Sequence, residues 1–322
     1  MHANQAQLLT DKIEKIVPRS ERMSLTRKIQ RINQLKQERN AVILVHNYQM
    51  PKIFHTVSDI VGDSLALARE AEKVDADVIV MAGVHFMAET AKLLNPNKTV
   101  LIPDTEAGCS LAESITPQDV LTLRNKYPGV PVITYVNTSA AVKAVSDICC
   151  TSGNAKKVVE ALGVPRVIMI PDEYLAQNIA QQTNVEILTW KGHCQVHELI
   201  APEDVEQMRQ DHPNAAILAH PECPPEVTAA ADFSGSTAEM SDFMDQKRAQ
   251  NVILLTECSM SDNLAINHPD INFIRLCNLC PHMQRITIDN ILDALENNRY
   301  EVNVDPSIAE PARLSIKRML EI

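Results

Sequence analysis

The segment Cys277-Asn-Leu-Cys280-Pro-His-Met283, near the C-terminus, contains the cysteine that reveals how this chain is organised. Cys280 lies 86 residues after Cys194, and Cys194 lies 85 residues after Cys109. Each of these cysteines follows a short apolar run, such as residues 271–274 before Cys280. One cysteine therefore occupies the same point in three successive segments of nearly equal length, which indicates an internal repeat.

Each segment also begins with an apolar run that ends in polar residues. These runs cover residues 41–48, 131–137 and 215–222. Continuous apolar runs without alternation predict strands buried on both faces, as in parallel sheets covered by helices. A helix, a second strand, a second helix and a third strand follow in each segment, and the third strand ends at the cysteine. The predicted fold class is α/β, with three αβα domains that carry small parallel sheets and are related by a pseudo-threefold axis.

The repeat also sets the predicted domain organisation. The expected parts are an N-terminal helical segment over 1–40, α/β repeats over 41–125, 126–212 and 213–297, and a C-terminal segment with a helix over 298–322. Leu25, Ile29 and Ile32 recur at helical spacing, so we expect the first segment to pack as a helix on the first repeat.

Charge and composition restrict the class of protein. The net charge of −11 argues against a nucleic-acid partner or binding to an anionic membrane. The polar start Met1-His-Ala-Asn-Gln5, and the lack of an apolar run near the roughly 20 residues of a membrane span, predict a cytoplasmic protein. In a reducing compartment, the 8 cysteines are expected to be metal ligands, catalytic thiols or buried side chains rather than disulfides.

We expect the functional residues to meet at the carboxyl ends of the strands, where open parallel sheets bind their ligands. The repeated cysteines follow the third strand of each segment, and His46, Tyr135 and Glu222 end or follow the first strand. Around a threefold axis, three thiolates would meet at a central junction and leave a metal or cluster one open position. Iron–sulfur chemistry and zinc both stay open, because histidines lie near the cysteines, namely His193, His197 and His282.

Hydroxyl residues stand where a helix follows the first strand of each segment. They are Ser64, Ser152 and the pair Ser236 and Thr237. A helix start carries unpaired N–H groups and a partial positive charge, which makes it a ready anion site. Plain helix capping would place the same residue types there, and the two roles do not exclude each other.

Taken together and in order, the motifs resemble those of the quinolinate synthase family over essentially the whole chain. The matching segments are His46-Asn-Tyr48, Gly62-Asp-Ser64, His85-Phe-Met-Ala-Glu-Thr90, Pro103-Asp-Thr-Glu-Ala-Gly-Cys109, Tyr135-Val-Asn137, Trp190-Lys-Gly-His-Cys194, His220-Pro-Glu222, Gly235-Ser-Thr237 and Cys280-Pro-His-Met283. The resemblance implies condensation of iminoaspartate, made by an L-aspartate oxidase, with dihydroxyacetone phosphate. The implied product is quinolinate, a precursor of NAD, formed with loss of phosphate and water.

The resemblance also implies a cofactor and roles for individual residues. The cofactor is a 4Fe-4S cluster acting as a Lewis acid, and Cys109, Cys194 and Cys280 match its ligands. The implied catalytic residues are Tyr135, Glu222, His46, His220 and Tyr48. The implied substrate-binding residues are His46, Ser64, Tyr135, Asn137, Ser152, His220, Glu222, Ser236 and Thr237.

The other five cysteines lack this repeat spacing. We interpret them as small buried side chains, namely Cys149, Cys150, Cys223, Cys258 and Cys277. One version of the family motif has a further cysteine before the final pair, and Ile274 stands at that position here. This difference argues against a redox role for Cys277.

Two other classes of protein are compatible with part of the pattern. An iron–sulfur sensor or electron carrier would normally use four protein ligands and would not need His46, Tyr135 and Glu222 at strand ends. An iron–sulfur dehydratase for another hydroxy acid is a second alternative, and phosphate-sized anion sites would count against it. The expected partners are the small-molecule substrates, with no nucleic acid and no membrane. A homodimer is possible, and the sequence leaves the oligomeric state open.

Overall fold

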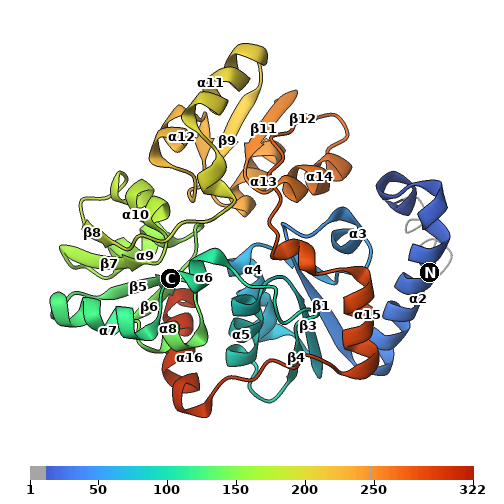
Figure 1. The fold of residues 1–322 in the computed structure, drawn as a ribbon, viewed down its shortest axis with the longest axis horizontal. Coiled ribbons are helices and arrows are strands. Elements are labelled where there is room, and N and C mark those ends of the chain that lie inside the picture. The colour runs from blue at the N-terminus through green and yellow to red at the C-terminus, as the bar shows by residue number, and fades with distance from the viewer. Residues whose placement is uncertain (1–11, 247–248) are drawn as a thin grey trace.

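The computed structural model of the chain describes residues 12–246 and 249–322, so residues 1–11 of the predicted N-terminal helical segment lie outside the described part. Three four-stranded parallel sheets surround one centre (Figure 1). This architecture confirms the predicted α/β fold class with three small parallel sheets. Among the described residues, no helix has both the length and the apolar character that crossing a membrane requires.

The first sheet has the strand order β2-β1-β3-β4. Its strands are β1 (Ala41–His46), β2 (Ile60–Gly62), β3 (Val78–Ala82) and β4 (Thr99–Leu101). The helices within or beside this part of the chain are α2 (Arg19–Glu38), α3 (Pro51–Phe54), α4 (Ser64–Lys73), α5 (His85–Leu94), α6 (Ser110–Glu113) and α7 (Pro117–Lys126).

The second sheet repeats this order as β6-β5-β7-β8. Its strands are β5 (Val132–Tyr135), β6 (Ile148–Cys150), β7 (Arg166–Ile170) and β8 (Glu186–Thr189). Its helices are α8 (Ala140–Ala144), α9 (Ala155–Ala161) and α10 (Glu173–Ala180), followed by the 3-10 helix η1 (His197–Leu199) and by α11 (Pro202–Asp211).

The third sheet has the order β10-β9-β11-β12. Its strands are β9 (Ala216–Ala219), β10 (Phe233–Ser234), β11 (Asn251–Leu255) and β12 (Asn272–Ile274). The helices are α12 (Pro225–Ala230), α13 (Thr237–Gln246), α14 (Cys258–Asn267), η2 (Met283–Arg285), α15 (Ile288–Asn297) and α16 (Pro306–Leu320).

Each sheet contains one strand more than the sequence pattern predicted. The additional strands β2, β6 and β10 span three, three and two residues and lie at the sheet edge beside the first strand of the unit. Segments this short carry no readable apolar pattern, so their pairing depends on the neighbouring strand. Each of them leads directly to the small residues that line the centre of the molecule.

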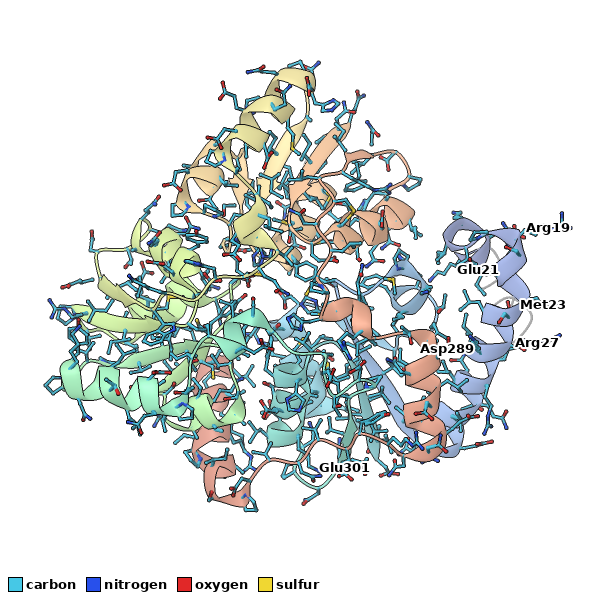
Figure 2. All side chains as sticks on the ribbon, in the orientation of Figure 1. Arg19, Glu21, Met23, Arg27, Asp289 and Glu301 are labelled. Atoms are coloured by element: carbon cyan, nitrogen blue, oxygen red, sulfur yellow. A yellow bond between two sulfur atoms is a disulfide. The ribbon has the colours of Figure 1, made fainter. Side chains whose placement is uncertain are left out.

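The helix that follows each repeated cysteine packs against the next unit. Val120 of α7 belongs to an apolar cluster of the second sheet, and Val205 of α11 belongs to a cluster of the third. α15 lies beside α2 and covers the first sheet (Figure 1). Lys28 on α2 pairs with Asp289 on α15 at 2.5 Å, and Figure 2 shows Asp289 between the two helices. The three units are therefore interlocked in a ring, while the exact limits predicted for each repeat stay a prediction.

The last helix joins the first two units. α16 packs on α8 and β6 of the second unit and on α5 of the first (Figure 1). Arg313 donates through Nε to the carbonyl of Leu93 at 2.6 Å, and Arg318 donates through Nη1 to the carbonyl of Asp147 at 2.7 Å. One continuous apolar cluster runs through both units and includes Ile316 of α16, whereas separate clusters flank the third sheet.

Candidate active site

A pocket lies where the three units meet. The predicted site residues that line it are His46, Tyr48, Ser64, Cys109, Tyr135, Asn137, Ser152, Cys194, His220, Glu222, Thr237 and Cys280. Of the predicted set, Ser236 does not line this pocket and lies behind it, almost fully buried. The carboxyl ends of three separate sheets thus contribute to a single cavity, as expected for parallel sheets.

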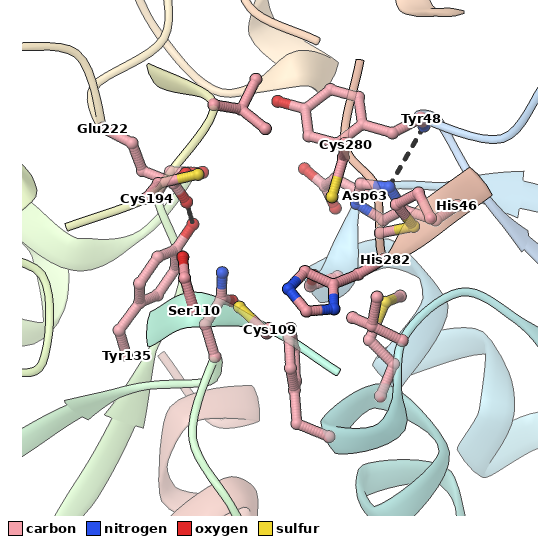
Figure 3. A pocket seen from close by; sticks show the side chains of 18 of the residues that line it. His46, Tyr48, Asp63, Cys109, Ser110, Tyr135, Cys194, Glu222, Cys280 and His282 are labelled. Atoms are coloured by element: carbon pink, nitrogen blue, oxygen red, sulfur yellow. Dashed lines mark hydrogen bonds between the residues drawn. The ribbon is translucent and has the colours of Figure 1, made fainter. Parts of the chain in front are cut away.

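The three repeated cysteines face this cavity from three loops (Figure 3). Each lies one to three residues before a short helical turn, which is α6 after Cys109, η1 after Cys194 and η2 after Cys280. In each turn the backbone N–H groups two and three residues beyond the cysteine are directed at its sulfur. Such groups stabilise a thiolate, because they donate hydrogen bonds to the charged form.

The pKa values of these thiols show two opposing influences. Burial raises the pKa of Cys109 to about 12, although the N–H groups of Ala112 and Leu111 lower it. Burial likewise raises the pKa of Cys194 and Cys280, against N–H groups from their own turns. Without a cation the thiols therefore hold their protons. A cationic group that bound all three sulfurs would displace these protons and find the N–H donors already in place.

Two histidines hold the same position in the first and third units. His46 ends β1, and its Nδ1 accepts the backbone N–H of Tyr48 at 3.1 Å. His220 follows β9, and its Nδ1 accepts the backbone N–H of Glu222 at 3.3 Å. An imidazole that accepts through Nδ1 carries its hydrogen on Nε2 when neutral. Both side chains therefore keep Nε2–H available as a donor.

Burial keeps both histidines neutral near pH 7. It lowers the pKa of His46 to about 4, although the Glu222 carboxylate acts in the opposite direction. It lowers the pKa of His220 to about 3, again against Glu222. A neutral imidazole in a cavity lined by thiols and a carboxylate can donate a hydrogen bond without adding charge.

Glu222 is the buried acceptor at the centre of this group. Its Oε1 accepts from the hydroxyl of Tyr135 at 2.5 Å, and its Oε2 lies 2.8 Å from Nδ1 of His197 (Figure 3 shows the Tyr135 bond). Burial acts to raise the pKa of Glu222, but the hydrogen bonds from His197 and the Tyr135 hydroxyl favour the charged form and hold this pKa below its ordinary range. Burial and Glu222 together raise the pKa of Tyr135 well above its ordinary value. The pair is therefore a phenol that keeps its proton and a carboxylate that lacks one.

His197 and Thr256 extend this network. From the sequence, His197 was expected only as a histidine near a cysteine that keeps zinc possible, and Thr256 was not expected at the site. Nε2 of His197 lies 2.9 Å from Oγ1 of Thr256, which lies 2.6 Å from the hydroxyl of Tyr48. The His197 ring also stacks on His220, with ring centres 4.7 Å apart. The counterparts of His197, three residues after the other repeated cysteines, are Ala112 and Met283. A polar residue at a position that is apolar in the other two repeats was the available signal.

The hydroxyl residues near the helix starts differ in their surroundings. Ser64 is the first residue of α4, but the N-cap is Asp63, whose Oδ1 accepts from the N–H of Ala66. Ser152 lies in a turn before α9 rather than at its first residue. Thr237 begins α13, lines the pocket and accepts a hydrogen bond from Asn47 Nδ2 at 2.9 Å.

Ser236 caps its own helix, α13. Its hydroxyl accepts from the N–H of Glu239 at 3.3 Å, and the Glu239 carboxylate accepts from the N–H of Ser236 at 2.8 Å. This reciprocal pair is a capping box at the start of α13. The helix starts thus reach the pocket through Ser64 and Thr237, and Ser152 reaches it from a turn.

Two cysteines are not the isolated buried side chains that we expected. Cys258 and Cys277 form a disulfide, which also contradicts the expectation of no disulfides. The start of α14 pairs with the loop before Cys280, because the N–H of Cys258 donates to the carbonyl of Asn278. This pairing brings the two Cα atoms to 4.8 Å, a proximity that sequence spacing does not reveal. Cys149, Cys150 and Cys223 are free and buried, as predicted.

One group of side chains could hold a single metal ion. Ligand atoms of Cys194, His197 and Glu222 all lie within 4.8 Å of one another. Thiolate, imidazole and carboxylate together form a donor set typical of zinc. The same cysteine also belongs to the three-thiol set, so the pocket can bind a metal in more than one way.

Comparison with known proteins gives one consistent family. Residues 30–321 match the family model described as "Quinolinate synthetase A protein". A protein named "Quinolinate synthase" from Agrobacterium fabrum is 66% identical over 314 residues, which cover 98% of this chain and 91% of that protein. A protein of the same name from Xylella fastidiosa is 69% identical over 301 residues, covering 94% and 89%. "Quinolinate synthase 2" from Mesorhizobium japonicum is 65% identical over 317 residues, covering 98% of each chain.

Proposed function

The chain belongs to the quinolinate synthase family, and from this premise we propose that it condenses iminoaspartate with dihydroxyacetone phosphate to give quinolinate. The reaction forms a carbon–carbon bond and releases phosphate and water. The observation that carries the proposal is the single cavity lined by three repeated thiols, two neutral imidazoles and the Tyr135–Glu222 pair. We further propose that an L-aspartate oxidase supplies iminoaspartate and that the product enters NAD biosynthesis.

The proposed cofactor is a 4Fe-4S cluster held by Cys109, Cys194 and Cys280. The support is that these three are the cysteines that line the described pocket, and that each sulfur faces two backbone N–H groups. Hydrogen bonds of this kind to sulfur are typical of iron–sulfur sites. When bound through three thiolates, such a cluster supplies one iron that is free to act as a Lewis acid toward a carboxylate or hydroxyl.

We propose that side chains of the protein itself carry out the proton transfers. Ring formation requires several proton transfers, and a positioned acid or base typically contributes roughly 10²–10⁴-fold to each. Glu222 is ionised and can accept a proton, while Tyr135 is protonated and can donate one. Because their oxygens lie 2.5 Å apart, a proton lost from the phenol could be replaced through the same carboxylate. His46 and His220 would orient substrate oxygens through Nε2–H.

The anionic substrates need local positive potential, since the chain carries a net charge of −11. The starts of α4 and α13 place helix dipoles and hydroxyls at the pocket through Ser64 and Thr237. Asn137 and Ser152 add polar side chains from the second unit. We propose that these groups bind the carboxylates of iminoaspartate and the phosphate of dihydroxyacetone phosphate.

An anaerobic assay tests this function directly. Purified protein would be mixed with freshly generated iminoaspartate and dihydroxyacetone phosphate, and quinolinate would be measured by mass spectrometry. We expect quinolinate only when both substrates and iron are present, with no product from reactions that lack either substrate. Protein that carries stoichiometric zinc, no iron and no quinolinate-forming activity would instead favour the Cys194–His197–Glu222 set as a zinc site.

A further inference from the structure

A continuous series of hydrogen bonds crosses the back of the pocket and connects its two tyrosines. From Tyr48 it passes to Thr256 at 2.6 Å, to His197 at 2.9 Å, to Glu222 at 2.8 Å and to Tyr135 at 2.5 Å. The members come from all three units. Thr256 and His197 are each 1% exposed, so water does not compete for their polar atoms.

Thr256 occupies the middle of this series without lining the pocket. It directly follows β11, and its hydroxyl contacts only Tyr48 and His197 among the described hydrogen bonds of its side chain. A hydroxyl has one hydrogen to donate and can accept from a second partner, so it can serve both neighbours at once. Its counterparts in the other two units, Gly83 and Pro171, have no such group.

The surroundings of His197 give the series a direction. Its Nδ1 faces Oε2 of Glu222 at 2.8 Å, and a carboxylate oxygen can only accept. Nδ1 therefore carries a hydrogen, and in the tautomer with this single ring hydrogen Nε2 is an acceptor. The hydroxyl of Thr256 then donates to Nε2 and accepts from the hydroxyl of Tyr48. Tyr48 consequently directs its hydrogen away from the cavity and presents an oxygen acceptor to it.

We propose that Thr256 is a positioning residue of this site: it holds the Tyr48 hydroxyl as an acceptor for a donor group of the substrate, and it keeps His197 oriented toward Glu222. The substrate group that Tyr48 would recognise is an O–H or N–H, which both proposed substrates carry. This inference rests on the proposed function for its catalytic consequence. The hydrogen positions that it assigns to Tyr48, Thr256 and His197 do not depend on the identity of the substrates.

The test compares three variants of the iron-loaded, full-length protein. Thr256→Val keeps the shape of the side chain and removes the hydroxyl, so the Tyr48 hydroxyl and Nε2 of His197 lose this partner. Thr256→Ser keeps the hydroxyl. Thr90→Val is the matched control, because Thr90 is also buried and its hydroxyl donates to the carbonyl of Phe86 within its own helix at 2.8 Å.

We expect Thr256→Val to lower kcat roughly 10- to 100-fold, as a small misplacement of a catalytic group can, with iron content like that of Thr90→Val. Its KM values should change by less than kcat, and Thr256→Ser should restore most of kcat. A merely structural role would leave kcat per iron-loaded molecule unchanged, whatever the change in melting temperature. If Thr256→Val matches the control in kcat, or if Thr256→Ser is as impaired as Thr256→Val, the proposal is wrong.

A second measurement separates this inference from the proposed function. Neutron diffraction from crystals of the iron-loaded protein would locate the hydrogens directly. We expect one on Nδ1 of His197, one between Thr256 and Nε2 of His197, and one between Tyr48 and Thr256. If the unmodified protein makes no quinolinate, the proposed function fails while these hydrogen positions can still hold. A hydrogen of Thr256 directed at Tyr48 would overturn the inference even in an active enzyme.

Discussion

Glu222 illustrates how single residues determine the chemistry of this pocket. A carboxyl group with 4% exposure would ordinarily keep its proton, because burial penalises the charged form. Here one carboxylate oxygen accepts from Tyr135 and the other lies against His197. These two donors make the ionised form the stable one, so a buried base is available at neutral pH.

Replacing Glu222 tests this role. Glu222→Gln preserves the shape of the side chain but removes its charge and basicity, so we expect kcat to fall at least about 100-fold. Iron content should stay at the level of the unmodified protein, since the side chain is not among the three thiols. Anaerobic turnover and iron analysis on the same samples provide the measurement. The control is Glu226→Gln, an exposed position on α12. Turnover within about twofold of this control would exclude Glu222 from the mechanism.

His55 makes the stability of the protein depend on pH. It follows α3, is 8% exposed and has no hydrogen-bond partner for Nε2. Burial, with a contribution from Lys12, lowers its pKa to about 4. The unfolded chain, with a histidine pKa of about 6.5, therefore binds more protons below that pH than the folded protein does. The contribution of neutral His55 to the free energy of unfolding is fully present above about pH 6.5 and is lost as the pH falls toward about 4.

The comparison with His55→Asn isolates this contribution. Between pH 8 and pH 5 we expect the unfolding free energy of the unmodified protein to fall by about 2 kcal/mol more than that of His55→Asn. Urea unfolding at several pH values measures the difference. His212→Asn, at an exposed position, is the control and should follow the unmodified protein. Parallel pH profiles for His55→Asn and the unmodified protein would contradict the prediction.

At this scale the sequence predicted most of the residues that line the pocket but not those behind them. His46, Tyr135 and Glu222 could be predicted because they stand at equivalent strand ends. Thr256 was not predictable, because nothing in the sequence shows that a threonine after β11 reaches a tyrosine after β1. Such pairs form only when separate units pack together.

At the level of helices and strands, the start of α13 divides its two hydroxyls between different tasks. Ser236 caps the helix, whereas Thr237 lines the pocket. Thr237→Ala should therefore raise the KM for the phosphate or dicarboxylate substrate several-fold and leave iron content unchanged. Ser236→Ala should instead lower the free energy of unfolding by about 1 kcal/mol, as for other N-cap losses. Steady-state kinetics and urea unfolding of both variants would separate the effects. A larger KM change for Ser236→Ala than for Thr237→Ala would reverse this assignment.

The longer strands were predictable because their apolar runs are continuous. β1, β3, β7 and β11 each coincide with such a run. The edge strands β2, β6 and β10 were not predictable, since two or three residues carry no period of their own. The Cys258–Cys277 disulfide was missed for a related reason. The pairing of α14 with the loop before Cys280 is a tertiary contact, and the spacing of 19 residues has no counterpart in the other repeats.

At the scale of the whole molecule, removing each thiol in turn tests whether all three units are needed to bind the metal centre. We expect Cys109→Ser, Cys194→Ser and Cys280→Ser each to lose most of the iron and all quinolinate formation, because each removes one of three ligands from a different loop. Iron and sulfide analysis of anaerobically purified protein measures this loss.

Cys277→Ser is the matched control for these variants. It breaks the disulfide, but Glu257 still accepts from the N–H of Cys280 and Asn278 still pairs with the start of α14. The loop that carries Cys280 should therefore keep its position, and iron content and activity should be retained. A loss of iron in Cys277→Ser equal to that in Cys280→Ser would show that the disulfide, rather than these hydrogen bonds, positions the loop.

The ring of units was predictable only in outline. The equal spacing of the three cysteines led to three sheets around an axis, which the structure confirms. That α7, α11 and α15 each pack on the unit after their own was not predictable. An amphipathic helix between two sheets has one apolar face, and its sequence does not reveal which sheet the face will cover.

Because α15 packs on the first unit, the order in which the chain is synthesised matters for the fold. The ribosome makes the chain from the N-terminus, so the first unit emerges long before α15, the helix that completes its cover. Cys280 is likewise the last of the three thiols to be made, and α16, which joins the first two units, follows it. A nascent chain therefore lacks a complete set of ligands until Cys280 has been made. Incorporation of a three-thiol metal centre is thus expected only after all three units have been synthesised.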